Sequence, residues 1–100
     1  MHNEEIVLET ENTKVRVIEL SANVKAPWHH HTEVTDNFFC LHGNIEIHIK
    51  NPDQVIPLKS GGRCKIEAET VHRVVNNTKE QAKYLLVQGV GKYDFIESDQ

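Results

Sequence analysis

The chain has 100 residues, enough for one domain and too few for two independent hydrophobic cores. Its 38% hydrophobic and 26% charged residues exclude a disordered or fibrous protein. The 11 basic and 15 acidic residues give a net charge of −4 without a basic cluster, so we expect no nucleic-acid partner. The unusual number is seven histidines, three of which are consecutive.

No apolar run approaches the ~18 residues that span a bilayer, and the first residues lack the pattern of a signal peptide. We therefore expect a cytoplasmic protein with no membrane contact. Cys40 and Cys64 form no CxxC pair, and no disulfide is expected. Cys40 stands in an apolar stretch, which favours a small buried side chain. Cys64 lies between Arg63 and Lys65, so either its pKa is lowered or these charges mark a solvated strand face.

Alternation of apolar and polar residues predicts β-strands along nearly the whole chain, most clearly at residues 45–50. Within residues 13–20 the alternation shifts by one place after Val17, which indicates a bulge or bend. The tail, residues 89–100, is either a last strand or an arm. In chain order, strands are predicted at residues 4–10, 13–20, 37–42, 45–50, 55–58, 63–66, 71–77 and 82–88.

Short strands separated by turn residues every ~8 to 12 residues are typical of a β-sandwich or barrel. No linker, repeat or low-complexity tract interrupts them, so residues 1–100 are predicted to form a single all-β domain. Alternate side chains of a barrel strand point into the interior. A histidine on such an inward face needs a partner, and a metal ion is a common one.

The strongest functional signal is the run of three histidines. On an extended segment His29 and His31 share one face, and His30 points the other way. Asp36 follows five residues after His31, and His72 lies in a later predicted strand. Three histidines and one carboxylate offer nitrogen and oxygen ligands that suit Fe, Mn, Ni, Co or Zn.

This arrangement resembles the cupin family, which has two short motifs. The first, G-x5-H-x-H-x(3,4)-E-x6-G, matches residues 29–43 from its histidines onward, with Asp36 in place of glutamate and without the opening glycine. The second, G-x5-P-x-G-x2-H-x3-N, matches the spacing of residues 61–76, with Glu67 and Glu69 in place of proline and glycine. With its flanking strands the resemblance covers the whole chain. It implies a small double-stranded β-helix, or jelly-roll barrel.

The resemblance also implies a site for one divalent transition metal. Its expected ligands are His29, His31 and His72, with Asp36 as the fourth candidate. Aspartate reaches about one methylene less far than glutamate, so we expect Asp36 to contribute less than any histidine, directly or through a water. Glu33 shares the parity of His29 and His31 if its loop is extended; it is either the alternative ligand or a loop carboxylate. The other interpretation is a metal-free barrel whose histidines bond each other or water.

Further positions have expected structural roles. The resemblance implies turn glycines at Gly43 and Gly61, and a structural Asn76 that closes the second motif. Trp28, directly before the histidines, either lines the pocket or packs in the core.

Three histidines are not expected to bind the metal. His30 and His42 are predicted at the surface, and His48 toward solvent or a partner. Tyr93 and Phe95 in the tail are expected to pack on the barrel or on a second subunit.

Two classes of function stay open. A metal held by three histidines keeps open positions for a small-molecule substrate, and cupin-like proteins catalyse dioxygenation, isomerisation, decarboxylation and lyase reactions. No acid–base pair stands out, although Glu33, Tyr84 and His48 are conceivable. The alternative is a non-catalytic barrel that binds or senses a small ligand. The sequence contains no effector domain for a sensor, which favours the enzyme.

A homodimer is expected as well. Alternation puts Ile18 and Leu20 opposite Val15 and Val17, so one core does not accommodate all four, and the tail adds apolar side chains. A two-fold interface buries such a patch twice. We expect residues 4–10 or the tail to cross to the partner.

Overall fold

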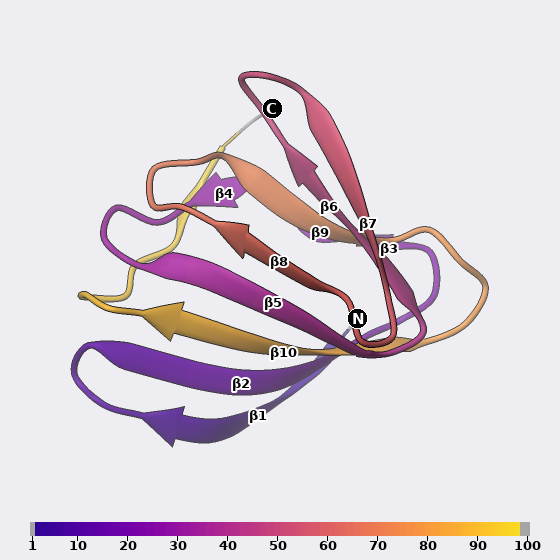
Figure 1. Ribbon diagram of the computed structural model, residues 1–100, viewed down its shortest axis with the longest axis horizontal. Helices are drawn as coiled ribbons and strands as arrows, with labels where there is room; N and C mark the ends of the chain where they lie inside the picture. The colour runs from indigo at the N-terminus through magenta and orange to yellow at the C-terminus, as the bar shows by residue number, and fades with distance from the viewer. Residues whose placement is uncertain (1, 99–100) are drawn as a thin grey trace.

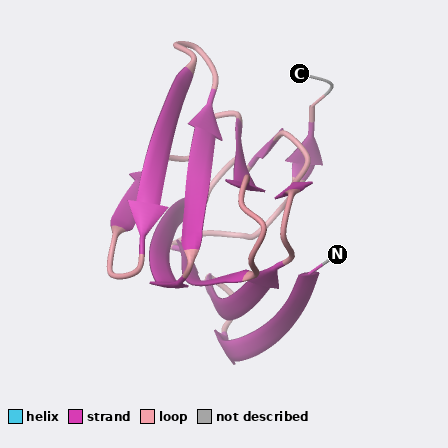
Figure 2. Ribbon diagram, turned by 90° about the vertical axis from the view of Figure 1, so that its right-hand side faces the viewer, coloured by secondary structure: helices cyan, strands magenta, loops and turns pink. Residues whose placement is uncertain are grey.

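A computed structural model describes residues 2–98, and their regular elements are all β-strands (Figure 1). The strands are β1 (His2–Glu9), β2 (Thr13–Leu20), β3 (Val24–Lys25), β4 (His29–His30), β5 (Thr35–His42), β6 (Asn44–Ile49), β7 (Gln54–Lys59), β8 (Arg63–Ile66), β9 (His72–Asn76), β10 (Ala82–Gly89) and β11 (Ile96–Glu97). Figure 2 shows only strands and loops over this part of the chain. Accordingly, no helix in residues 2–98 is able to cross a membrane.

The strands form two sheets with antiparallel pairing. One has the order β1-β2-β10-β5-β8 and the other β11-β4-β9-β6-β7, with β3 also paired to β9. The two sheets face each other, and the segment after β10, yellow in Figure 1, passes from the first sheet to β4 of the second. The prediction of an all-β jelly-roll fold is confirmed.

All the predicted strands form, with ends within two residues of the predicted ones. The pattern did not predict the two-residue strands β3 and β4, and the tail forms both an arm and the short strand β11, paired to β4. Two-residue strands give too little alternation to be detected.

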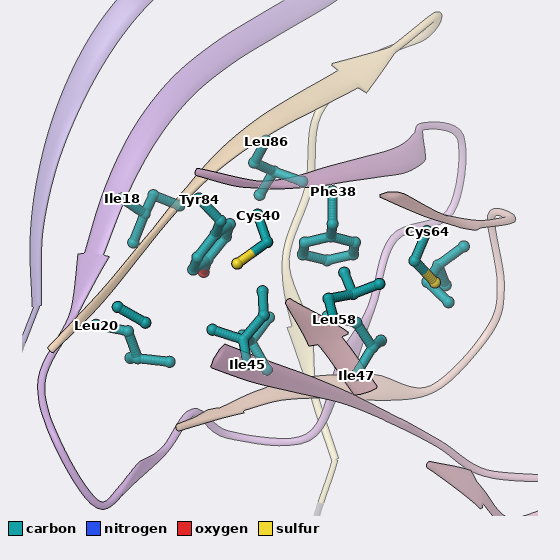
Figure 3. Packing of buried hydrophobic residues seen from close by; sticks show 13 residues of the cluster. Ile18, Leu20, Phe38, Cys40, Ile45, Ile47, Leu58, Cys64, Tyr84 and Leu86 are labelled. Atoms are coloured by element: carbon teal, nitrogen blue, oxygen red, sulfur yellow. The ribbon is translucent and has the colours of Figure 1, made fainter. Parts of the chain in front are cut away.

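Apolar side chains from both sheets fill the space between them. Figure 3 shows Phe38 and Tyr84 from the first sheet pointing toward Ile45, Ile47 and Leu58 of the second. These side chains are nearly inaccessible to solvent, and Ile47 is fully buried. The alternation of each strand therefore supplies one face to a shared core.

Both cysteines belong to this core and are free thiols. Burial raises the pKa of Cys40 and of Cys64. The expected buried role of Cys40 is confirmed. For Cys64 the idea of a lowered pKa is wrong: its charged neighbours Arg63 and Lys65 are exposed, while the thiol itself points inward.

The predicted bulge in β2 is also wrong. β2 pairs with β10 in continuous register from Thr13 to Leu20, and the irregularity lies in β1, between Ile6 and Leu8. The inward positions of β2 are Arg16, Ile18 and Leu20. The alternation seemed to shift because a charged residue, Arg16, occupies a buried position.

Turns in both motifs have the geometry that the spacing of the motifs implies. Gly43 and Gly61 have φ angles of 79° and 91°, in the region that favours glycine, which confirms their predicted role. Glu69 stands at the motif's glycine position and still has a φ of 71°. Its backbone N–H donates to the His31 carbonyl at 2.7 Å, which ties the turn before His72 to the histidine segment.

Asn76 has the expected structural role. Its side chain is fully buried, and its Nδ2 donates to the backbone carbonyls of Leu20 and Glu80 at 3.1 and 2.8 Å. Its Oδ1 accepts from the backbone N–H of Thr78 at 3.1 Å. Asn76 thereby fixes the loop that leads from β9 to β10.

Candidate metal centre

Four predicted site residues meet at one end of the interior. One ligand atom of each lies within 4.8 Å of those of the others, and all four side chains are buried; they are His29, His31, Asp36 and His72. His29 on β4 is the direct cross-strand partner of His72 on β9, with ring centroids 4.4 Å apart. Asp36 comes from β5 in the facing sheet, so the cluster joins the two sheets.

Backbone carbonyls fix the orientation of all three imidazole rings. Nδ1 of His29 lies 2.9 Å from the Pro27 oxygen, and Nδ1 of His72 lies 2.7 Å from the Thr70 oxygen. Nδ1 of His31 lies 2.5 Å from the oxygen of Asp94 in the tail. A carbonyl oxygen only accepts, so each Nδ1 donates its proton and each Nε2 is left for the cluster.

Asp36 meets two of these Nε2 atoms. Its Oδ2 lies 2.8 Å from His72 Nε2 and 3.2 Å from His31 Nε2. A carboxylate only accepts, so each Nε2 must carry a proton there or be bound to a cation. Protonation places two positive rings 5.6 Å apart in a buried space, whereas one divalent ion satisfies both nitrogens and the carboxylate. The donor set therefore fits a metal ion.

The pKa shifts follow from burial and from this close packing. Burial, together with the charge of His72, lowers the pKa of His29 to about 4, so its ring is neutral at pH 7. Burial also lowers the pKa of His31, but the hydrogen bond and charge of Asp36 outweigh it and raise the pKa overall. Burial raises the pKa of Asp36, yet the two histidines hold it well below its usual range. A neutral His29 and an ionised Asp36 are the forms that bind metals.

Two residues that the sequence analysis did not select complete the site. Gln88 on β10 lies directly opposite Asp36, and its Nε2 donates to Asp36 Oδ1 at 2.9 Å. Its Oε1 accepts a hydrogen bond from the guanidinium of Arg16 on β2. Arginine only donates, so the amide oxygen of Gln88 must face Arg16 and its NH2 group must face Asp36. These hydrogen bonds, from Arg16 through Gln88 to Asp36 Oδ1, direct Asp36 Oδ2 toward the histidines.

The tail covers the histidines from outside. The ring of Phe95 stacks on His29 with centroids 4.3 Å apart, and the Tyr93 ring lies 5.5 Å from that of His31. The Asp94 carboxylate accepts from the backbone N–H and the hydroxyl of Thr32 at 2.9 and 2.6 Å. Tyr93 and Phe95 pack on their own barrel, one of the two alternatives left open.

A cavity of about 330 Å³ adjoins the cluster. His29, His31 and Asp36 lie in its wall. The rest of the lining is mainly apolar and includes Ile18, Pro27, Phe38, Val74, Tyr84 and Leu86, with Glu4, Arg16 and Gln88 as further polar members. A small organic molecule in this space would contact the cluster directly.

The other candidates lie outside the cluster. Glu33 is exposed, and its Oε1 accepts from the backbone N–H of Lys92 at 2.8 Å, so it is a loop carboxylate and the idea that it replaces Asp36 is wrong. His42 is exposed as predicted, and His30 is only half-buried.

Trp28 and His48 lie together on the outer face of the second sheet. His48 Nε2 is 2.9 Å from Glu46, and Arg73 lies over the Trp28 ring at 4.2 Å. Trp28 neither lines the cavity nor joins the core, so both of its predicted roles are wrong. Arg73, the residue after His72 on β9, faces outward, and Trp28 packs on it.

Comparison with known proteins gives a family and a fold. The model of the cupin domain family matches residues 16–88. No protein of curated function shows significant sequence similarity to the chain.

Solved structures with the same fold share little sequence. An uncharacterized conserved protein with a double-stranded β-helix domain from Klebsiella pneumoniae has a TM-score of 0.86 at 24% identity, over 99% of this chain and 85% of that one. The polyketide cyclase RemF of Streptomyces resistomycificus has a TM-score of 0.84 at 14% identity, over 99% and 72%. An oxalate oxidase has a TM-score of 0.78 at 14% identity, over 86% and 46%.

Proposed function

The chain belongs to the cupin family, and we propose that it binds one divalent transition-metal ion at the buried cluster. The ligands are His29, His31, His72 and Asp36. The observation that carries the proposal is that backbone carbonyls engage Nδ1 of all three histidines, which leaves three Nε2 atoms to converge beside a carboxylate. A mixed nitrogen and oxygen set suits Fe, Mn, Ni, Co or Zn.

The ion would serve a metal-dependent enzyme that acts on a small molecule, with dioxygenase, isomerase or lyase chemistry. Four protein ligands leave positions for a substrate around a metal that prefers five or six, and the cavity gives access to them. When bound, such an ion supplies Lewis-acid or redox chemistry. Two proteins with this fold, the cyclase RemF and the oxalate oxidase, are enzymes by name, which supports this class.

The chain's own residues orient and shield the site. Gln88 directs Asp36, and the rings of Phe95 and Tyr93 exclude water from the histidines. Burial raises the pKa of the Tyr84 hydroxyl, so in the cavity it stays neutral and acts through hydrogen bonds. Of the acid–base candidates from the sequence, only Tyr84 lines the cavity.

A non-catalytic barrel that binds or senses a small ligand is the second candidate. One observation favours it: outside the cluster, the only carboxylate among the described cavity-lining residues is Glu4, which is paired with Arg16 at 3.2 Å. General acid–base catalysis would then depend on the substrate or on the ligands of the metal.

Elemental analysis of the untagged protein, purified without added metal, tests the site. We expect one transition metal per chain. His72→Ala should lower metal affinity at least about 10-fold, Asp36→Ala by less, and His48→Ala, the matched control on the outer face, should leave it unchanged. A wild-type protein that binds no metal, or full occupancy in His72→Ala, would contradict the proposal. Oxygen uptake and isomer formation over a substrate panel then separate enzyme from binding module.

A homodimer and a cytoplasmic location complete the proposal. Ile6, Val7 and Leu8 are each more than half exposed on the edge strand β1, a combination that proteins usually cover. β1 pairs with β2 and β11 with β4 within one chain, so a dimer forms on these edges or by exchange of the same strands. Light scattering should give about twice the monomer mass. A clean monomer would exclude the dimer, and cell fractionation tests the location.

A further inference from the structure

A buried guanidinium lies in the cavity wall, where Gln88 separates it from the candidate metal ligand Asp36. The Arg16 side chain is 9% exposed, in a wall that is otherwise mainly apolar. Its terminal nitrogens donate to the Glu4 carboxylate, at 3.2 and 3.3 Å, and to Gln88. Its Nε–H is buried without an acceptor among residues 2–98. A buried donor without an acceptor is costly, so an arginine here needs a reason beyond packing.

The two partners of Arg16 differ in how firmly they are held. Gln88 is 1% exposed and bonded to Asp36 as well, so it is fixed. The Glu4 side chain is 38% exposed and comes from the edge strand β1, so it can turn toward solvent without disturbing the core. Glu4 thus occupies the guanidinium as a displaceable carboxylate.

The surroundings of Arg16 favour a negatively charged group. Lys14 Nζ lies 4.3 Å and the Arg16 guanidinium 5.6 Å from the centre of the Tyr93 ring, which lines the cavity, so a second cation lies near the ring beside Arg16. Apolar side chains line most of the rest of the cavity, with Ile18, Phe38 and Leu86 among them. Such a space suits an apolar body with one charged end.

We infer that Arg16 binds the carboxylate of a small organic acid, which replaces Glu4, while the apolar body of the acid lies along the apolar lining of the cavity. The inference rests on the proposed function for the role of the cavity, but the contact with Arg16 does not require the metal. A carboxylate is the expected anion, because the side chain that now engages Arg16 carries the same group and a single guanidinium matches a single planar anion.

The test uses three acids, phenylacetate, benzoate and hexanoate, each compared with its neutral amide in NMR titrations of the metal-loaded protein. At least one acid should bind saturably in the cavity. Arg16→Gln should weaken that binding at least about tenfold, and Glu4→Gln should strengthen it severalfold, because the competing carboxylate is gone. Both variants should leave amide binding within about twofold. Lys25→Gln and Glu5→Gln remove the same charges at exposed positions and should change nothing.

Several results would overturn the inference. One is that none of the three acids binds saturably, and another is that inorganic phosphate binds more tightly than any of them. A third is that Arg16→Gln changes the affinities for acid and amide equally. The last is that Arg16→Gln and Glu4→Gln change the affinity for the acid in the same direction. If Arg16→Gln does not fold, the Glu4→Gln comparison decides alone. Repeating the titrations after chelation separates the two proposals: acid binding that needs the metal and ignores Arg16 contradicts this inference. If the purified chain binds no metal at all but the two variants still have opposite effects, only the metal proposal is contradicted.

Discussion

The interior of the barrel has two ends, and the same strands build both. Along β5 the inward residues run from Asp36 to Phe38, along β9 from His72 to Val74, and along β10, in reverse, from Leu86 to Gln88. β2 follows the same gradient from Arg16 to Ile18. Every one of these strands is therefore polar at one end of its inward face and apolar next to it. The tail, yellow in Figure 1, passes beside the polar ends.

The two ends differ in how their side chains are stabilised. Burial stabilises the side chains at the apolar end without requiring specific partners. Whether this end tolerates a substitution therefore depends on the volume of the new side chain. At the polar end each group requires a specific partner, because a buried polar group without one is costly. A substitution at the apolar end should therefore affect folding, and one at the polar end should affect binding.

The largest effect is expected at the apolar end. Ile47→Ala removes a fully buried side chain and should lower the free energy of unfolding by about 2–5 kcal/mol. Metal content per folded chain should not change, because Ile47 is outside the cluster. Urea denaturation with elemental analysis of the folded fraction checks both values. Loss of metal from folded Ile47→Ala protein would show that the two ends are not separable.

Removal of the metal should destabilise the polar end. A ligand at 100 times its dissociation constant stabilises the folded state by about 2.7 kcal/mol, so chelation of the wild type should lower the free energy of unfolding by about that amount. The same treatment of His72→Ala should have little effect. Thermal unfolding before and after dialysis against a chelator measures the difference. Equal loss in both proteins would point to an effect of the chelator elsewhere.

Substitution of Gln88 tests whether metal binding at the polar end depends on the hydrogen bonds that link Arg16, Gln88 and Asp36. Gln88→Leu keeps the approximate volume but removes the donor to Asp36, and should weaken metal binding severalfold, by no more than Asp36→Ala does. Gln54→Leu, at an exposed position on β7, is the matched control. Competition with a fluorescent chelator gives both affinities. Unchanged affinity in Gln88→Leu would mean that the histidines hold Asp36 in place by themselves.

The smallest effect concerns the turn directly before His72. Glu69 has a positive φ, which costs a residue with a side chain about 1 kcal/mol relative to glycine. Glu69→Gly should therefore raise the free energy of unfolding by up to about 1 kcal/mol, and Glu67→Gly, two residues earlier, should not. Destabilisation by Glu69→Gly would show that the Glu69 side chain has a stabilising contact.

The sequence predicted the strands, the fold and the composition of the cluster because these depend on periodicity and on fixed spacings. His29 and His31 share a face on any extended segment, and the spacing of the second motif predicted that His72 would join them. Asp36 reaches the cluster although it is shorter than glutamate, because β5 places it opposite Gln88 at the end of the interior.

What the sequence did not reveal depends on pairing between distant strands. Arg16 looked like a break in the pattern because nothing local shows that Gln88, 72 residues away, accepts its hydrogen bond. A signal for Gln88 was present, since it continues the inward alternation of Tyr84 and Leu86. The outward place of Trp28 depends on Arg73, which again comes from another strand.

The hydrogen bond between His31 and Asp94 has a consequence for biosynthesis. The two residues are 63 positions apart, so at a translation rate of about 5–20 residues per second, roughly 3 to 13 seconds separate the synthesis of His31 from that of Asp94. For the first 41 of these 63 residues the nascent chain lacks His72, and for the whole interval it lacks the carbonyl that orients His31. Contacts between such distant residues also close late in folding. We therefore expect that metal is loaded into a finished barrel and does not serve as a template for the emerging one.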